Sequence, residues 1–111
     1  MYQGKSTTQE KQIIYKTGNI EVNSAKRTAS IDGEKLNLTD LEYNILEYLL
    51  MNKQQVISPS QLFKAIWHEE YYYGANNTIM VHIRHLRQKI EKDPTNPEHI
   101  KTIWGKGYYC E

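Results

Sequence analysis

The chain has 111 residues, of which 39% are hydrophobic and 24% are charged, and its formal net charge at pH 7 is +1. This length allows one hydrophobic core and excludes two domains of ordinary size. No run approaches the roughly 20 consecutive apolar residues of a membrane span, and no early segment has the apolar centre of a signal peptide. Cys110 is the only cysteine, which excludes an internal disulfide. We therefore expect a protein of the reducing cytoplasm, without a membrane as a partner.

The charges are unevenly distributed along the chain. Residues 1–75 contain eight Lys or Arg and nine Asp or Glu, whereas residues 76–111 contain six and four. The small positive surplus therefore lies in the last third, which favours a polyanion as the partner of that part.

Residues 1–12 show no hydrophobic periodicity, and we expect them to be a flexible linker or lead-in. Short extended runs follow, and turn residues such as Thr17-Gly18 and Asp32-Gly33 separate them. Asp-Gly between two alternating runs is a strong hairpin signal, because both turn residues need positive φ. We predict an antiparallel sheet of three or four strands over residues 13–15, 19–23, 27–31 and 34–38.

Two helices are predicted next, each beginning at a capping box. Thr39 and Glu42 form the first, and Leu41, Ile45 and Leu49 continue it as a largely buried helix to about Asn52. Ser58, Pro59 and Gln61 form the second, with proline at the first helical position, and this helix ends near Trp67-His68. Partly buried positions are expected for Tyr43, Tyr48 and Trp67.

Residues 76–91 are expected to form a third helix, with Asn76 or Asn77 as its cap. The helix face opposite the apolar stripe of Ile79, Ile83, Leu86 and Ile90 has no acidic residue in the first three turns. Such a face can donate hydrogen bonds to phosphates and to base edges, although a solvated basic helix is the simpler interpretation of this segment alone. The apolar stripe falls at helical spacing and comprises Ile79, Ile83, Leu86 and Ile90.

The C-terminal region reads as a hairpin. The segment 93–98 contains two prolines and cannot be the interior of a helix. Residues 99–104 and 108–110 have the pattern of two strands, and Gly105-Lys106-Gly107 is the turn between them.

No pattern indicates catalysis, a cofactor or a metal site. His82 and His85 share a helix, but structural zinc usually takes four Cys or His ligands with recognisable spacing. Gly105-Lys106-Gly107 is too short for a phosphate-binding loop, because no Lys-Ser or Lys-Thr pair and no helix follows it. We therefore expect a binding protein and not an enzyme.

Several spaced motifs together resemble the OmpR/PhoB-type winged-helix DNA-binding domain, the output half of two-component response regulators. The motifs are Leu38-Thr39 with Glu42 and Leu46, Ser58 with Leu62 and Trp67, Val81-His82-Ile83-Arg84 with Leu86-Arg87 and Lys89, and Ile100 and Thr102 with Gly105-Lys106-Gly107-Tyr108. The resemblance implies an α+β winged helix-turn-helix over residues 13–111, with an N-terminal antiparallel sheet, three helices and a C-terminal β-hairpin wing.

The same resemblance implies a function in transcription regulation. The third helix would enter the major groove of double-stranded DNA, and the wing would follow the adjacent minor groove. Family members also carry a receiver domain that a sensor kinase phosphorylates, so we expect this chain to be a fragment or an isolated effector domain of a phosphorelay. Two such domains commonly bind direct repeats head to tail.

Three positions depart from the family pattern. Asn77 stands where arginine is common, Met80 where an acidic residue is common, and Trp104 where arginine is common before the glycine turn. The first two departures change which bases are read, whereas the third puts a cationic contact of the wing in doubt. Trp104 either approaches the minor groove or only packs the wing against the third helix.

The expected DNA contacts fall into three groups. Base edges would be read by Asn77, Met80, Val81, Arg84 and His85. The phosphate backbone would be bound by Asn76, Thr78, His82, Arg87, Lys89 and Thr102, and the wing contacts would come from Trp104 and Lys106.

The loop before the third helix contains Glu69, Glu70, Tyr71, Tyr72 and Tyr73. Its tyrosine hydroxyls can reach a phosphate, and the family resemblance equally makes the loop a surface for RNA polymerase. The sequence leaves both open. The alternative function from another class is a winged-helix protein-interaction module that uses this loop.

Overall fold

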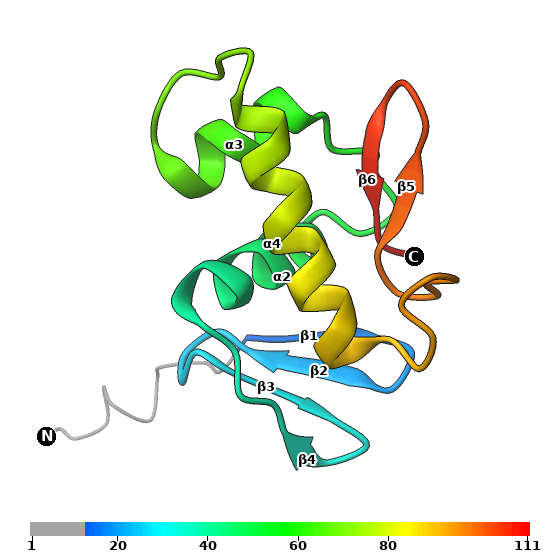
Figure 1. The fold of residues 1–111 in the computed structure, drawn as a ribbon. Helices are drawn as coiled ribbons and strands as arrows, with labels where there is room; N and C mark the ends of the chain where they lie inside the picture. The colour runs from blue at the N-terminus through cyan, green and yellow to red at the C-terminus, as the bar shows by residue number, and fades with distance from the viewer. Residues whose placement is uncertain (1–12) are drawn as a thin grey trace, which may run out of the picture.

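The computed structural model describes residues 13–111, so the flexible linker expected for residues 1–12 lies outside the described part (Figure 1). It shows a sheet, three helices and a hairpin, which confirms the α+β winged-helix class. The elements are β1 (Ile14–Thr17), β2 (Ile20–Asn23), β3 (Thr28–Ile31), β4 (Glu34–Lys35), α2 (Asp40–Met51), α3 (Pro59–Trp67), α4 (Ala75–Ile90), β5 (Lys101–Ile103) and β6 (Gly107–Tyr109).

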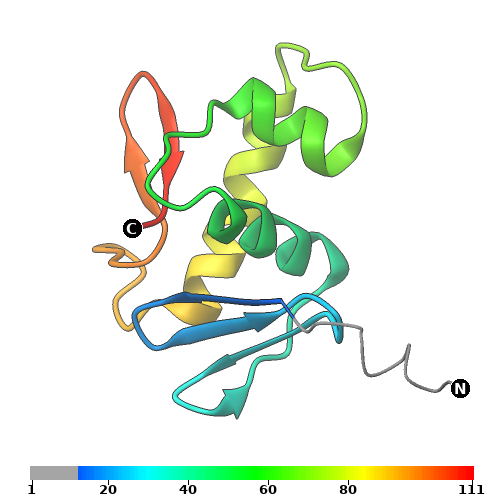
Figure 2. The ribbon, with the colours of Figure 1, turned by 180° about the vertical axis from the view of Figure 1, so that it is seen from behind.

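The N-terminal sheet is antiparallel in the order β1-β2-β3-β4. Asp32 and Gly33 have φ angles of 51° and 85°, so the predicted Asp-Gly hairpin forms with both turn residues at positive φ. β4 is shorter than expected, because only Ser30 and Ile31 of β3 pair with it. The sheet lies at one end of the molecule and the helices pack on one of its faces (Figure 2).

The capping boxes differ in outcome. At α2 both halves form, since the Glu42 N–H donates to Thr39 Oγ1 at 3.2 Å and the Thr39 N–H donates to Glu42 Oε1 at 2.9 Å. At α3 the Gln61 N–H donates to Ser58 Oγ at 3.0 Å. The second hydrogen bond of this predicted capping box, from the Ser58 N–H to the Gln61 side chain, is a wrong prediction. The Gln61 side chain instead donates to the Tyr48 hydroxyl at 3.0 Å.

The start of α4 differs from the prediction. The helix begins at Ala75, and its N-cap, Gly74, makes no side-chain hydrogen bond, so the expected caps Asn76 and Asn77 lie inside the first turn. Packing explains the earlier start, because Ala75 is fully buried and its N–H donates to the carbonyl of Tyr72. The predicted apolar stripe is confirmed: Ile79, Ile83, Leu86 and Ile90 are all buried.

The wing is a hairpin of β5 and β6 that stands beside α4 (Figure 1). Ile57 bridges it to the segment between α2 and α3, since Ile57 and Tyr108 exchange two backbone hydrogen bonds of 2.8 and 2.9 Å. Gly107 is required at this crossing, because a Cβ there would lie 2.0 Å from the carbonyl oxygen of Ile57. The wing is therefore fixed at Tyr108, and its tip, residues 104–106, is exposed.

Candidate nucleic-acid interface

A groove of about 930 Å³ separates α4 from the wing. One wall is the exposed face of α4, and the other is β5 with the tip of the wing. None of the described residues that line the groove is acidic. Among the expected DNA contacts, those brought together here are Asn76, Asn77, Met80, Val81, Arg84, Arg87, Thr102, Trp104 and Lys106.

The exposed face of α4 follows from helical spacing. Residues 77, 81, 84 and 88 succeed one another at i, i+4, i+7 and i+11, so they align on one side of the helix. Met80 is 50% exposed and Val81 is 40% exposed, although both are apolar. Gln88 also lines the groove and was not among the expected contacts. Its spacing from Asn77 and Arg84 is the signal that identifies it.

The wing presents an aromatic and a cation together. Trp104 is 87% exposed, so it does not pack the wing against the third helix and this alternative is wrong. Lys106 is exposed at the adjacent turn. Both side chains border the groove from the side opposite Arg84.

The expected contacts on α4 that lie outside this groove are Thr78, His82, His85 and Lys89. His85 is exposed on the helix, and Thr78 is half-buried. The ring of His82 lies against Trp67, with centroids 5.5 Å apart. Trp67 is also stacked on Phe63 at 5.0 Å, which agrees with its expected place at the core. His82 therefore packs at the junction of α3 and α4.

Lys89, which is expected to contact a phosphate, is engaged within the protein in this structure. Its Nζ donates to Glu42 Oε1 at 2.6 Å and to the carbonyl of Asn37 at 2.9 Å. Glu42 lies at the start of α2, so Lys89 joins α4 to the buried side of the domain. Two residues apart on a helix correspond to about 200°, which explains why Arg87 and Lys89 point in opposite directions.

Arg87 is also engaged within the protein, at the side of α4 that faces the wing. Its Nε and Nη2 donate to the carbonyl of Ile100 at 3.0 and 2.8 Å, and Nη2 also donates to Thr102 Oγ1 at 2.8 Å. Burial lowers the pKa of Arg87, and the guanidinium remains charged. The Nε and Nη2 groups of Arg87 are thus directed at the segment that leads into the wing.

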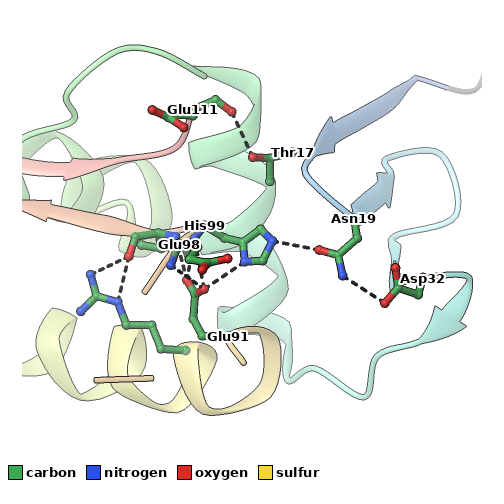
Figure 3. A network of polar contacts seen from close by, with 9 residues as sticks. Thr17, Asn19, Asp32, Glu91, Glu98, His99 and Glu111 are labelled. Carbon is green, nitrogen blue, oxygen red and sulfur yellow. Dashed lines mark hydrogen bonds and ion pairs between the residues drawn. The ribbon is translucent and has the colours of Figure 1, made fainter. Parts of the chain in front are cut away.

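Glu91, at the C-cap of α4, was not singled out from the sequence. Its buried carboxylate accepts hydrogen bonds from the backbone N–H groups of Glu98, His99 and Ile100 (Figure 3). His99 Nδ1 lies 2.9 Å from Glu91 Oε1, and its Nε2 lies 3.0 Å from Asn19 Oδ1. Burial by itself raises the pKa of Glu91, but these hydrogen bonds outweigh it and lower the pKa. Sequence spacing carries no sign of this cluster.

The tyrosine loop forms a separate surface beside α3. The rings of Tyr71 and Tyr72 are nearly perpendicular to that of Phe63, at centroid distances of 6.1 and 5.6 Å, and Tyr73 is 100% exposed. Glu70, one of the two acidic residues of the loop, has its Oε2 3.4 Å from Lys64 Nζ. Only Tyr71 also lines the groove, so the rest of the loop is directed elsewhere.

His82 packs against Trp67, and His99 bonds Glu91, so these two histidines have protein partners. Within residues 13–111 no three His, Cys, Asp or Glu side chains gather where they could hold a metal ion. Within the same residues no helix is long and apolar enough to span a membrane.

Residues 33–110 match the family described as "Transcriptional regulatory protein, C terminal". The chain belongs to this family. The match confirms the resemblance to OmpR/PhoB-type effector domains, and the family is one of transcription regulators and not a class of enzymes.

Curated relatives support the assignment. The chain is 39% identical over 108 residues to the transcriptional regulatory protein YrkP of Bacillus subtilis, covering 97% of this chain and 46% of that protein. It is 42% identical over 103 residues to the regulatory protein VanR of Enterococcus faecium, covering 93% of this chain and 44% of that protein. The chain thus spans less than half the length of these relatives.

Two solved structures share the fold. The DNA-binding domain of RstA from Klebsiella pneumoniae, solved in complex with the RstA box, is 26% identical with a TM-score of 0.80, covering 87% of this chain and 95% of that one. The response regulator DrrB of Thermotoga maritima, an OmpR/PhoB homologue, is 28% identical with a TM-score of 0.79, covering 95% of this chain and 46% of that one.

Proposed function

We propose that this chain is the effector domain of a two-component response regulator and binds specific sequences of double-stranded DNA. The observation that carries the proposal is the acid-free groove between the exposed face of α4 and the wing. A polar helix face beside a hairpin suits a duplex, because the helix fits the major groove and the hairpin reaches the next minor groove.

Base reading is assigned to the part of α4 that faces the groove. Arg84 is suited to the O6 and N7 acceptors of guanine, and Asn77 to the N6 and N7 of adenine. Met80 and Val81 offer apolar contact to a thymine methyl. His85 directly follows Arg84 and is exposed on a neighbouring side of α4, so it is assigned as a peripheral base contact.

Phosphate contacts are assigned to the start of α4 and to the wing. The first turn has no side-chain cap, and its N–H groups at Ala75 and Asn77 already donate to the carbonyls of Tyr72 and Gly74. The phosphate contacts proposed here are therefore the side chains of Asn76 and Thr78. Lys106 and Thr102 approach the backbone from the wing, and Trp104 contacts the minor groove. His82 is proposed as a further phosphate contact at the edge of α4.

The whole protein is proposed to be about twice as long as this chain, as its curated relatives are. The additional part would be a receiver domain under the control of a sensor kinase, in the cytoplasm. The exposed Tyr72 and Tyr73, with Glu69 and Glu70, form the surface proposed for RNA polymerase. Two copies would bind direct repeats head to tail.

Selection of bound sequences from a random pool of duplex DNA at near-physiological salt tests the proposal. We expect one preferred sequence, and affinity for it should fall with salt at a log–log slope of about −0.9 per neutralised phosphate. Binding with no sequence preference, or with almost no salt dependence, would contradict it. If the chain instead binds a protein partner with almost no salt dependence, the result would support the alternative of an interaction module that uses the tyrosine loop.

A further inference from the structure

The C-terminal half of α4 and its C-cap, Glu91, hold the residue immediately before the first strand of the wing, Ile100. Glu91 accepts the N–H of Ile100 at 2.8 Å, and Arg87 donates to the carbonyl of the same residue at 3.0 and 2.8 Å. Ile100 itself is fully buried. Both polar groups of this one residue are therefore fixed by α4, immediately before β5 begins.

The contact extends in both directions from Ile100. Arg87 reaches forward to Thr102 Oγ1 at 2.8 Å, within β5, while Glu91 reaches back to the N–H groups of Glu98 and His99 at 2.9 and 3.1 Å. Arg87 and Glu91 are four residues apart, so they lie one above the other on the same side of the helix. A charged group engaged by several backbone groups is a strong and directional restraint.

The other strand of the wing is held elsewhere. β6 is bound through Tyr108 to Ile57, which lies between α2 and α3 and not on α4. Tip residues 104–106 are exposed. Within the described residues, the polar side chains that join α4 and its C-cap to β5 or to the residue before it are those of Arg87 and Glu91. Arg87 bonds Thr102 of β5, and both bond Ile100.

We infer that Arg87 and Glu91 are positioning residues, which fix the wing relative to the base-reading face of α4 so that Lys106 and Arg84 engage one duplex together. This inference rests on the proposed DNA-binding function for its consequence, but the positioning itself is a property of the free protein. Arg87 thus acts on DNA through the wing and not by touching a phosphate.

The positioning can be measured without DNA, from the distance between spin labels on His85→Cys and Lys106→Cys. Cys110 does not take up label, because it is 1% exposed and burial raises the pKa of its thiol to about 12. We expect a narrow distance distribution in the labelled parent and a broad one after Arg87→Met or Glu91→Gln. Lys89→Met is the matched control, since it removes a cation of the same helix whose partners lie on α2 and before it.

Thr102→Val provides a second test if Arg87→Met fails to fold. It keeps the guanidinium and removes one of its acceptors, so it should broaden the distribution less than Arg87→Met does. Distributions that stay as narrow as that of the parent in Arg87→Met and Glu91→Gln, or in Thr102→Val if Arg87→Met does not fold, would overturn the inference.

The consequence is measured with unlabelled protein on the DNA sequence selected by the parent. Arg87→Met should weaken binding by about tenfold, within the range seen for coupled contacts, and Lys106→Ala should then weaken it no further. Equal effects of Lys106→Ala in both backgrounds would overturn the link between Arg87 and the wing. If the parent itself selects no sequence, the proposed function fails, whereas the spin-label distances still decide the positioning.

Discussion

Lys89 Nζ and Glu42 Oε1 lie 2.6 Å apart, which ties the last turn of α4 to the first turn of α2. The Glu42 side chain is only 5% exposed, so its carboxylate depends on this partner and on the Thr39 N–H. Burial raises the pKa of Glu42, but the hydrogen bonds from Lys89 and Thr39 outweigh it, and the pKa is lowered. The pair therefore links α4 to α2, with a nearly buried carboxylate and a partly exposed ammonium, and does not line the groove.

Lys89→Met should lower the free energy of unfolding by about 1–3 kcal/mol, because it leaves a nearly buried carboxylate without its cation. Urea titration at pH 7 measures this loss. The exposed Lys92→Met is the control and should stay within about 0.5 kcal/mol of the parent. The salt slope of DNA binding should not change in Lys89→Met. A slope reduced by about 0.9 at unchanged stability would return Lys89 to the phosphate role.

Glu91 should make the free energy of unfolding depend on pH in the acid range. Its pKa in the folded protein lies below the ordinary value of 4.5, so the folded state takes up the proton less readily than the unfolded state. The stabilisation is present in full above that ordinary value and is lost as the pH falls through the lower, folded pKa.

Glu91→Gln isolates this contribution, since other acidic groups such as Glu42 are the same in both proteins. At pH 7 the variant should be about 1.5–3 kcal/mol less stable than the parent, because charged hydrogen bonds to three N–H groups are replaced by weaker ones. Urea titrations between pH 7 and pH 3 should show the difference shrinking in the acid range. A difference that stays constant would show that the negative charge contributes nothing.

Two glycines of the wing form a matched pair. A Cβ on Gly107, where φ is 150°, would lie 2.0 Å from the carbonyl oxygen of Ile57, whereas at Gly105, where φ is 76°, nothing lies within 4 Å. Gly107→Ala should therefore separate the wing from Ile57 and cost more than about 3 kcal/mol, the sum of overpacking and backbone strain. Gly105→Ala should cost only about 1–2 kcal/mol. Thermal unfolding of both variants checks this, and equal losses would contradict it.

The sequence predicted what short-range patterns determine. The stripe from Ile79 to Ile90 and the caps at Thr39 and Ser58 depend on neighbours within one or two turns, and the structure confirms them. The Asn76 or Asn77 cap was wrong because burial of Ala75 moved the start of the helix.

The groove was predictable in part. Asn77, Val81 and Arg84 share a face by helical spacing alone, and the structure places all three at the groove. The internal roles of Arg87, Lys89 and Glu91 were not predictable, because their partners are mostly backbone groups of other segments. Lys89 reaches the carbonyl of Asn37, 52 residues away, and no periodicity records such a contact.

Arg84 should dominate base discrimination. Arg84→Ala is expected to weaken binding to the selected sequence by about 1–3 kcal/mol and to relax preference at one base pair, as the loss of a bidentate contact does. His85→Ala is the comparison, because His85 is exposed on the same helix but does not line the groove, and it should cost less. Repeating the random-pool selection with each variant measures both effects. An unchanged preference in Arg84→Ala would mean that another face of α4 reads the bases.

The wing presents its charge and its aromatic ring on different residues, so their contributions can be separated. Lys106 is exposed and cationic, and a phosphate contact from it would release one counterion. Trp104 is 87% exposed but uncharged, and its indole can contribute apolar contact with sugars in the minor groove. Only the first contribution depends on salt.

Lys106→Ala should therefore weaken binding to all sequences alike and lower the magnitude of the salt slope by about 0.9. Trp104→Ala should weaken binding at every salt concentration and leave the slope unchanged. Fluorescence anisotropy at four or more salt concentrations measures both quantities, and the unfolding temperature of Trp104→Ala checks that its hairpin is intact. Unchanged affinity and slope in Lys106→Ala would remove the wing from the interface, and recognition would then rest on α4 alone.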